Sequence, residues 1–166
     1  MIYVLQVQTG KELTVCHRLK NKNIDAFSPR RELIIHKNGL WTKVINTLFK
    51  GYVFIICDYS AKLHHAVVTD DDVIKFLGSP TPLPKHEETF MNMLINNGKI
   101  IEQSIALVDE NGLVSGYEGF LKDKEDMIVY VNKRQLKVAV EVRFGGKAHR
   151  ANLGIELKRA DDTRSK

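Results

Sequence analysis

The sequence has few of the features that mark secreted or membrane proteins. Its 166 residues include only two cysteines, Cys16 and Cys57, and these do not form a Cys-x-x-Cys pair. Such usage argues against a disulfide framework and fits a reducing compartment. No apolar run approaches the roughly 18 residues of a membrane-spanning helix, and the first residues lack the basic and apolar regions of a signal peptide. We therefore expect a cytoplasmic, monomeric protein with no membrane contact.

Motifs for catalysis, cofactors and metals are absent as well. The sequence contains no Walker A loop, no Gly-x-Ser-x-Gly elbow and no Gly-x-Gly-x-x-Gly after a strand. Gly145-Gly146-Lys147 lacks an upstream glycine and a following Ser or Thr, which favours a hairpin turn over a phosphate loop. His64-His65 would point about 100° apart on a helix, and Asp70-Asp71-Asp72 is interpreted as a self-capping turn. We predict that the protein is not an enzyme and needs no cofactor or metal.

What the sequence does contain is material for a core and an excess of positive charge. Hydrophobic residues make up 43% and charged residues 27% of the chain, and the formal net charge is +5. This balance is typical of a folded protein and favours a polyanionic partner only weakly. A basic protein without any nucleic acid partner fits the composition equally well.

Residues 1–99 mix strand and helix patterns. Strands are predicted over 2–8, 24–27, 51–56 and 73–77, and Asn38-Gly39 is typical of a type I′ turn between two further strands. Thr9 and Glu12 match a capping box before a helix. Further helices are expected over 60–67 and from Glu87 to a stop at Gly98. The predicted inward residues of the first and third helices are Leu13, Cys16, Leu19, Phe90, Met91, Leu94 and Ile95.

Residues 104–160 show strand patterns only. Strands are predicted over 105–108, 117–121, 127–131, 136–144 and 147–157. Five short strands in so few residues indicate a small barrel, which closes its own edges. The predicted class is therefore α+β with two domains: 1–99, an antiparallel sheet flanked by helices, and 104–160, a five-stranded SH3-like β-barrel.

Several segments, in order along the whole chain, resemble the NusG family of transcription elongation factors. Residues 48–54 resemble the Phe-Pro-Gly-Tyr-Val segment of its N-terminal (NGN) domain, and 2–6 resemble its opening Trp-Tyr-Val-Val-Gln strand. Gly10-Lys11-Glu12 is similar to its Gly-x-Glu helix start, and 73–78 to its Val-x-x-Phe-x-Gly segment. Gly119 and Phe144-Gly145 stand where the family's KOW barrel carries Gly and Phe-Gly. The lack of insertions is most similar to specialised antiterminator paralogues such as LoaP.

The resemblance implies a binding function in transcription. An NGN domain docks on the clamp helices of RNA polymerase and suppresses pausing and termination. The residues that would line the docking surface by motif position are Ile2, Tyr3, Phe49 and Tyr52. Judged from residue type alone, such aromatic residues beside a glycine in a strand favour a place in the core.

Departures from the family pattern affect the expected partners of the barrel. The family's Gly-Pro-Phe tip, which contacts Rho or a ribosomal protein, is replaced by Gly112-Leu113-Val114, and Lys50 replaces a proline. Loss of the aromatic ring favours a specialised antiterminator that contacts a nascent RNA hairpin. The alternative is a general NusG-type factor whose KOW domain recruits a protein instead of RNA.

Charge placement gives an independent reason to expect RNA binding. Residues 127–159 hold eight Lys or Arg against two acids, whereas 100–126 hold two against seven. Clustered cations favour a phosphate-binding face, although the two segments could also neutralise each other. The predicted RNA-binding residues are Lys133, Arg134, Lys137, Arg143, Lys147, His149, Arg150, Lys158 and Arg159. A second cationic stretch is equally compatible with non-template DNA and with a solvated helix face: Arg18, Lys20, Lys22, Arg30 and Arg31.

Overall fold

The computed structural model describes residues 1–78 and 80–160, and the chain divides into two compact units. The first unit consists of Met1–Pro29, Thr47–Lys99 and Arg143–Lys147; the second consists of Arg30–Asn46, Ile100–Val142 and the chain from Ala148 on. Each unit thus includes a segment from the other part of the sequence. That 1–99 and 104–160 fold independently stays a prediction.

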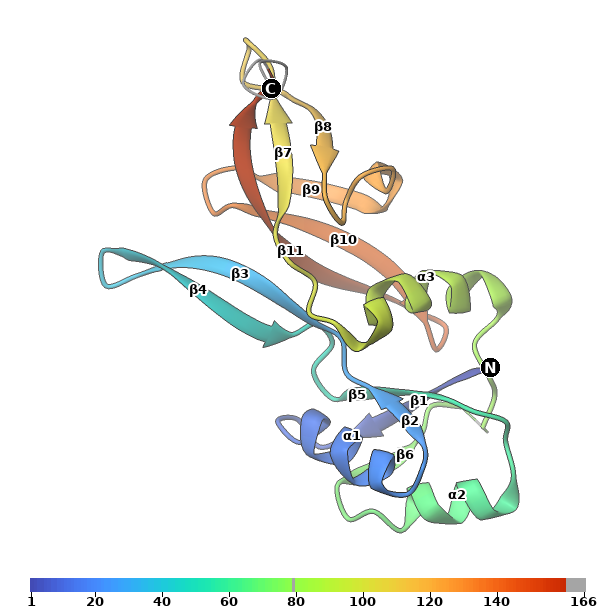
Figure 1. Ribbon diagram of the computed structural model, residues 1–166. Coiled ribbons are helices and arrows are strands. Elements are labelled where there is room, and N and C mark those ends of the chain that lie inside the picture. Colours follow the sequence, from blue (N-terminus) through green and yellow to red (C-terminus); the bar gives the residue numbers. More distant parts are fainter. Residues whose placement is uncertain (79, 161–166) are drawn as a thin grey trace. The chain divides into compact units, whose positions relative to one another are not determined.

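The first unit contains the predicted antiparallel sheet with its helices. Its strands, in spatial order, are β2 (Asp25–Phe27), β5 (Tyr52–Ile56), β1 (Ile2–Val7) and β6 (Val73–Phe76). All three neighbouring pairs run antiparallel. Figure 1 shows α1 (Glu12–Asn21) and α2 (Ala61–Val68) on one face of this sheet and α3 (Lys85–Ile95) on the other. The predicted α+β class is confirmed.

The face covered by α1 and α2 holds a continuous hydrophobic core. Tyr3, Leu5 and Val7 of β1 point into it because alternate residues of a strand share a face. The buried positions of α1 are Glu12, Val15, Cys16 and Leu19. This is the i, i+3, i+4, i+7 arc of a helix. Leu13, predicted to point inward, lies one position off the arc and is 48% exposed.

The predicted capping box is only half present. The helix starts after Lys11 without any side-chain cap, so the predicted role of Thr9 is wrong. Glu12 is buried, and its carboxylate accepts hydrogen bonds from the backbone N–H of Gly10 at 3.0 Å and of Gly51 at 2.8 Å. Because Gly51 precedes β5, Glu12 fixes the start of α1 against the start of that strand.

The third helix ends earlier than predicted. Met91, Leu94 and Ile95 are buried, but Phe90 is 37% exposed. Asn96 and Asn97 both adopt positive φ values, 52° and 56°, and these end α3 before Gly98 is reached. None of the helices within residues 1–78 and 80–160 has the length and apolarity needed to cross a membrane.

The second unit contains a curled five-stranded sheet, as predicted for the C-terminal half. Its strands, in spatial order, are β8 (Val114–Glu118), β7 (Ser104–Val108), β11 (Lys147–Arg159), β10 (Lys137–Phe144) and β9 (Ile128–Asn132). β7 and β11 pair in parallel, with Ile155 opposite Ser104. β8 starts three residues before the predicted strand 117–121 and ends at Glu118, because Gly119 turns the chain with a φ of 89°.

The predicted Asn38-Gly39 hairpin is confirmed and belongs to the second unit. It joins β3 (Arg30–Lys37) to β4 (Leu40–Thr47), and both turn residues have positive φ. The backbone of β3 exchanges two hydrogen bonds with Ile101: Glu32 N–H donates to it at 2.9 Å, and Arg30 C=O accepts from it at 2.8 Å. These bonds hold the base of the hairpin at the entry to the five-stranded sheet.

Candidate functional site

Four aromatic rings meet on the sheet face opposite α1 and α2, and we call them the aromatic cluster: Phe49, Tyr52, Phe54 and Phe144. The ring centroid of Phe144 lies 5.2 Å from Phe49, 5.1 Å from Tyr52 and 5.2 Å from Phe54, each time edge to face. Phe144 is fully buried in this contact. Edge-to-face pairs add to the free energy of burial, so this contact is a favourable one.

The turn that carries Phe144 contacts the rest of the first unit at a second point. Gly145 has a φ of 63°, and a Cβ added there would overlap the side chain of Leu77. Residues 143–147, which belong to the first unit, therefore pack against the rest of it through two successive residues. From the sequence, Phe144-Gly145 is identifiable only as a barrel motif, because nothing in the spacing indicates a contact with Phe49 or Tyr52.

The predicted docking residues do not share one face of the sheet. Ile2 lies on the face of the aromatic cluster, since it pairs with Ile56 two positions along from the Val4–Phe54 pair. Tyr3 points the other way, against Tyr59 and Phe76. Burial, and then the nearby Cys57, raises the pKa of Tyr3. A partner bound to the face that holds Ile2 and Tyr52 could therefore contact Tyr3 only through the backbone atoms of Tyr3.

The predicted RNA-binding residues are mostly exposed but scattered. Arg143 and Lys147 lie in the first unit and the others in the second. Lys133 donates from Nζ to the carbonyl of Gly112. Arg150 Nε lies 3.5 Å from a carboxylate oxygen of Glu141, so an acid shares its charge. Arg159 lines a hollow together with two further acids, Asp109 and Glu110.

Two of these cations meet in one open groove of the second unit, which we call the hairpin groove. It has a volume of about 910 Å³ and is lined by Ile35, His36, Trp41, Tyr130, Asn132, Arg134, Gln135 and Lys137. Trp41 is 52% and Tyr130 60% exposed. The His36 and Trp41 rings lie 5.0 Å apart. These rings were not predicted as site residues; a large aromatic side chain next to an Asn-Gly turn is the only sequence signal that points to them.

The second cationic stretch is divided between the two units: Arg18, Lys20 and Lys22 belong to the first, and Arg30 and Arg31 to the second. Arg18 donates two hydrogen bonds to the carboxylate of Asp70, at 2.7 and 2.9 Å, and one to Asp72. The hydrogen bonds to Asp72 and Asp70 raise the pKa of Arg18. Lys22 donates to the carbonyl of Ala66, and burial lowers the pKa of Arg31. A contact of this stretch with non-template DNA stays a prediction.

Asp70-Asp71-Asp72 forms the predicted self-capping turn. The Asp70 carboxylate accepts from the backbone N–H of Asp72 at 3.0 Å. Of the neighbouring histidines, His65 is solvated as predicted, whereas His64 stacks on Phe76 with ring centroids 5.1 Å apart. In the part of the chain that the structure describes, no three His, Cys, Asp or Glu side chains are grouped as metal ligands would be.

The sequence of this chain is similar to those of known proteins. Residues 2–94, more than half of the chain, match the family model described as "Transcription termination factor nusG". The chain is 26% identical over 107 residues to the transcription termination/antitermination protein NusG of Campylobacter jejuni; the match covers 57% of this chain and 60% of that protein. The matched region thus spans less than two thirds of this relative's length.

A solved structure has a similar fold. It is described as "Domain interaction in Thermotoga maritima NusG", with a TM-score of 0.50, 16% identity and 92% of each chain covered. At that identity the similarity concerns the fold alone. The similarity covers both the helix-flanked antiparallel sheet and the five-stranded sheet described above.

Proposed function

This chain belongs to the NusG family, and on that premise we propose that it is a transcription elongation and antitermination factor of the specialised, LoaP-like kind. It docks on the clamp helices of RNA polymerase through the first unit and suppresses pausing and termination. Basic residues of the second unit contact a hairpin of the nascent RNA. The mechanism is binding without catalysis: a ligand that prefers the closed clamp shifts the polymerase population toward that state.

The docking proposal rests on the aromatic rings that gather on one face of the first unit's sheet. Apart from Phe144, the rings that meet there come from β5 and the segment just before it. Tyr52 is half-buried, and its ring packs against Phe144. Aromatic anchors of this kind dominate the free energy of protein interfaces once they are open to a partner. In our proposal, release of Phe144 opens Ile2, Phe49 and Tyr52 to the polymerase.

Replacing Tyr52 with alanine tests the docking surface. We expect Tyr52→Ala to weaken binding to core RNA polymerase by about 1–3 kcal/mol, the scale of an interface hot spot. Fluorescence titration of labelled protein with core polymerase measures the effect. Tyr130→Ala, which removes an exposed ring from the second unit, is the matched control and should leave polymerase binding intact. If a folded Tyr52→Ala variant binds polymerase like the wild type, this surface is not the docking site.

RNA binding by the second unit should depend steeply on salt. Lys and Arg contacts to phosphate release counterions, and each contact contributes roughly one unit to the slope of log affinity against log salt. A module of this size offers about three to five contacts, so Arg134→Ala should flatten the slope by about one unit. Binding of a labelled RNA hairpin over a salt series measures it. Lys62→Ala, an exposed lysine of α2, is the control.

The same salt series separates the RNA function from protein recruitment. Leu113 is 62% exposed beside Gly112, so this tip lacks the aromatic ring of the family pattern but still presents an apolar side chain. If the protein has no RNA affinity at low salt, the alternative gains: a general NusG-type factor that recruits a protein through this tip.

A further inference from the structure

We infer that the hairpin groove binds an unpaired stretch of RNA, with nucleobases stacked on Trp41 and Tyr130 and phosphates held by Arg134 and Lys137. The inference rests on the proposed RNA contact and adds where it occurs and which form of RNA it takes. It also brings in the β3–β4 hairpin, which the basic residues alone would not involve. Figure 1 shows this hairpin and the turn between β9 and β10 projecting to the same side of the second unit.

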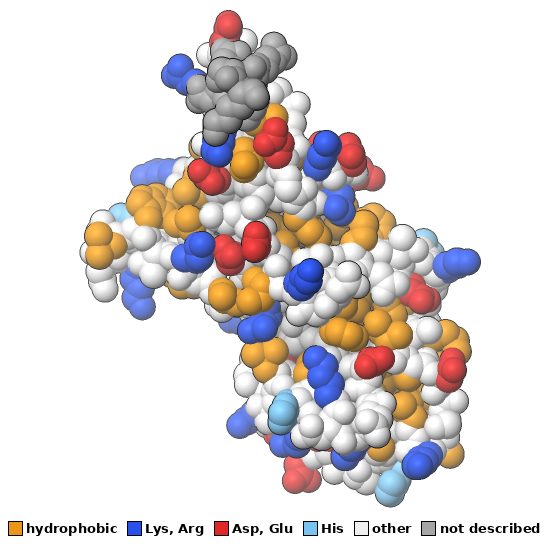
Figure 2. All heavy atoms as spheres, in the orientation of Figure 1, with side chains coloured by type: hydrophobic (Ala, Val, Ile, Leu, Met, Phe, Trp, Pro, Cys, Tyr) orange, Lys and Arg blue, Asp and Glu red, His pale blue; other side chains and the backbone are white. Residues whose placement is uncertain are grey.

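The first argument is the exposure of the rings. More than half of the surface of Trp41 and of Tyr130 is open to water, although both side chains are largely apolar. Figure 2 shows hydrophobic side chains gathered over the projecting β3–β4 hairpin. His36 supports the indole of Trp41 at 5.0 Å, which holds the ring in place without covering it. A ring held with its face open is what base stacking requires.

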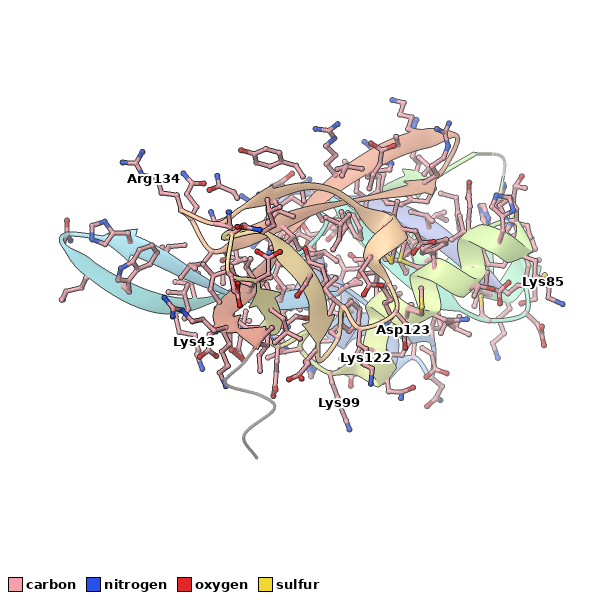
Figure 3. The ribbon with its side chains drawn as sticks, turned by 90° about the horizontal axis from the view of Figure 1, so that it is seen from above. Lys43, Lys85, Lys99, Lys122, Asp123 and Arg134 are labelled. Atoms are coloured by element: carbon pink, nitrogen blue, oxygen red, sulfur yellow. The ribbon has the colours of Figure 1, made fainter. Side chains whose placement is uncertain are left out.

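The second argument is the polar lining. Arg134 and Lys137 supply two positive charges, and within residues 1–78 and 80–160 no Asp or Glu lines the groove. Figure 3 shows the Arg134 side chain extending away from the sheet, above the β3–β4 hairpin in that view. The amides of Asn132 and Gln135 bond to each other across the turn at 3.3 Å and can also face base edges. The hollow beside Arg159, lined by Asp109 and Glu110, has no such complementarity to RNA.

The third argument is that both walls of the groove are fixed by neighbouring residues of β11. Gly154 lets β3 approach closely, since a Cβ added there would lie 2.5 Å from the carbonyl oxygen of Glu32. The next residue, Ile155, donates its backbone N–H to the carbonyl of Leu136 in the β9–β10 turn at 3.0 Å. The groove therefore exists before any ligand binds, and preorganisation reduces the entropy lost on binding.

Unpaired RNA fits these features better than a duplex does. The base faces of a duplex are stacked on one another, so open rings would have nothing to bind. The hairpin groove has a volume of about 910 Å³, within the roughly 300–1,000 Å³ of ordinary ligand sites, and so has room for extruded bases. Loop or bulge nucleotides of a hairpin carry both free bases and close phosphates. An apolar protein segment would use the rings but not the paired cations.

The experiment uses the intrinsic fluorescence of the full-length protein, because Trp41 is its single tryptophan. Oligoadenylate should quench the emission on binding, whereas a blunt RNA duplex of equal length should not. Trp41→Leu and Tyr130→Leu keep an apolar side chain but lose the ring. Each should lower the affinity for labelled oligoadenylate by about 5- to 150-fold, the range of one lost stacking contact. Trp41→Phe should recover most of the affinity.

The control is Val129→Ala, which truncates an exposed residue next to Tyr130 that does not line the groove. Its affinity for oligoadenylate should equal that of the wild type. Unchanged Trp41 emission on RNA binding, or leucine variants that bind like the wild type, would overturn the inference. Salt-dependent RNA binding that persists in that case leaves the proposed function standing. Absence of RNA affinity for every probe at low salt removes both.

Discussion

Phe144→Ala is expected to raise the affinity for core RNA polymerase by at least about tenfold, a change of roughly 1.4 kcal/mol. Phe144 packs on the rings of Phe49 and Tyr52. The proposed docking surface needs these two rings to be free to contact the polymerase. Truncating a buried Phe to Ala typically removes about 3–5 kcal/mol of packing free energy, which sets the upper limit of the gain. Titration of labelled protein with core polymerase measures the change.

A matched variant separates release of the turn from general loosening of the fold. Phe90→Ala also removes a phenylalanine from the first unit, but from the exposed side of α3. Its polymerase affinity should stay at the wild-type value. If Phe144→Ala lowers the urea midpoint of unfolding and leaves polymerase affinity unchanged, then Phe49 and Tyr52 serve packing only.

Gly154→Val should lower the free energy of unfolding by about 3 kcal/mol, the upper end of typical overpacking effects. The added side chain meets the carbonyl oxygen of Glu32 and the Cα of Leu33, and backbone atoms cannot rotate away as side chains do. β3 must then shift relative to β11, which also displaces one wall of the hairpin groove. Urea unfolding gives the stability, and quenching of Trp41 by oligoadenylate reports the groove.

The comparison for this variant is Gly116→Val, in β8 of the same sheet. A Cβ at Gly116 meets no atom of the described residues within 4 Å. Valine favours a strand, so this substitution should be neutral or slightly stabilising. Equal stability losses at Gly154 and Gly116 would mean that the close approach of β3 to β11 does not contribute to the fold.

Local chemistry made much of the secondary structure predictable. Asn38-Gly39 specifies its turn because both residues tolerate positive φ, and the structure has both there. The apolar run before Cys57 predicted a central strand, and β5 lies between β2 and β1. Errors came where distant residues decide the outcome. Glu12 fits a capping box by sequence, yet it accepts from Gly51, 39 positions away.

The candidate sites were less predictable for the same reason. The motif match selected Tyr52, but neither periodicity nor charge shows that Phe144 packs on it. Positive charge selected Arg134 and Lys137, but Trp41 joins them only because β3 packs close to Gly154 of β11. Charge also placed Arg18 in a cationic stretch, but it gave no indication of the hydrogen bonds that Arg18 donates to Asp70. Contacts between segments far apart in sequence leave no local pattern.

The late position of Phe144 in the chain has a consequence during synthesis on the ribosome. Phe49, Tyr52 and Phe54 are made first, and their partner ring follows some 90 residues later. At about 5–20 residues per second, translation leaves this apolar face without Phe144 for roughly 5–20 s. The parallel pairing of β7 with β11 also waits for the last strand. A nascent chain in that interval exposes hydrophobic surface, which favours aggregation and chaperone binding. The order of synthesis therefore determines how long the nascent protein is prone to aggregate.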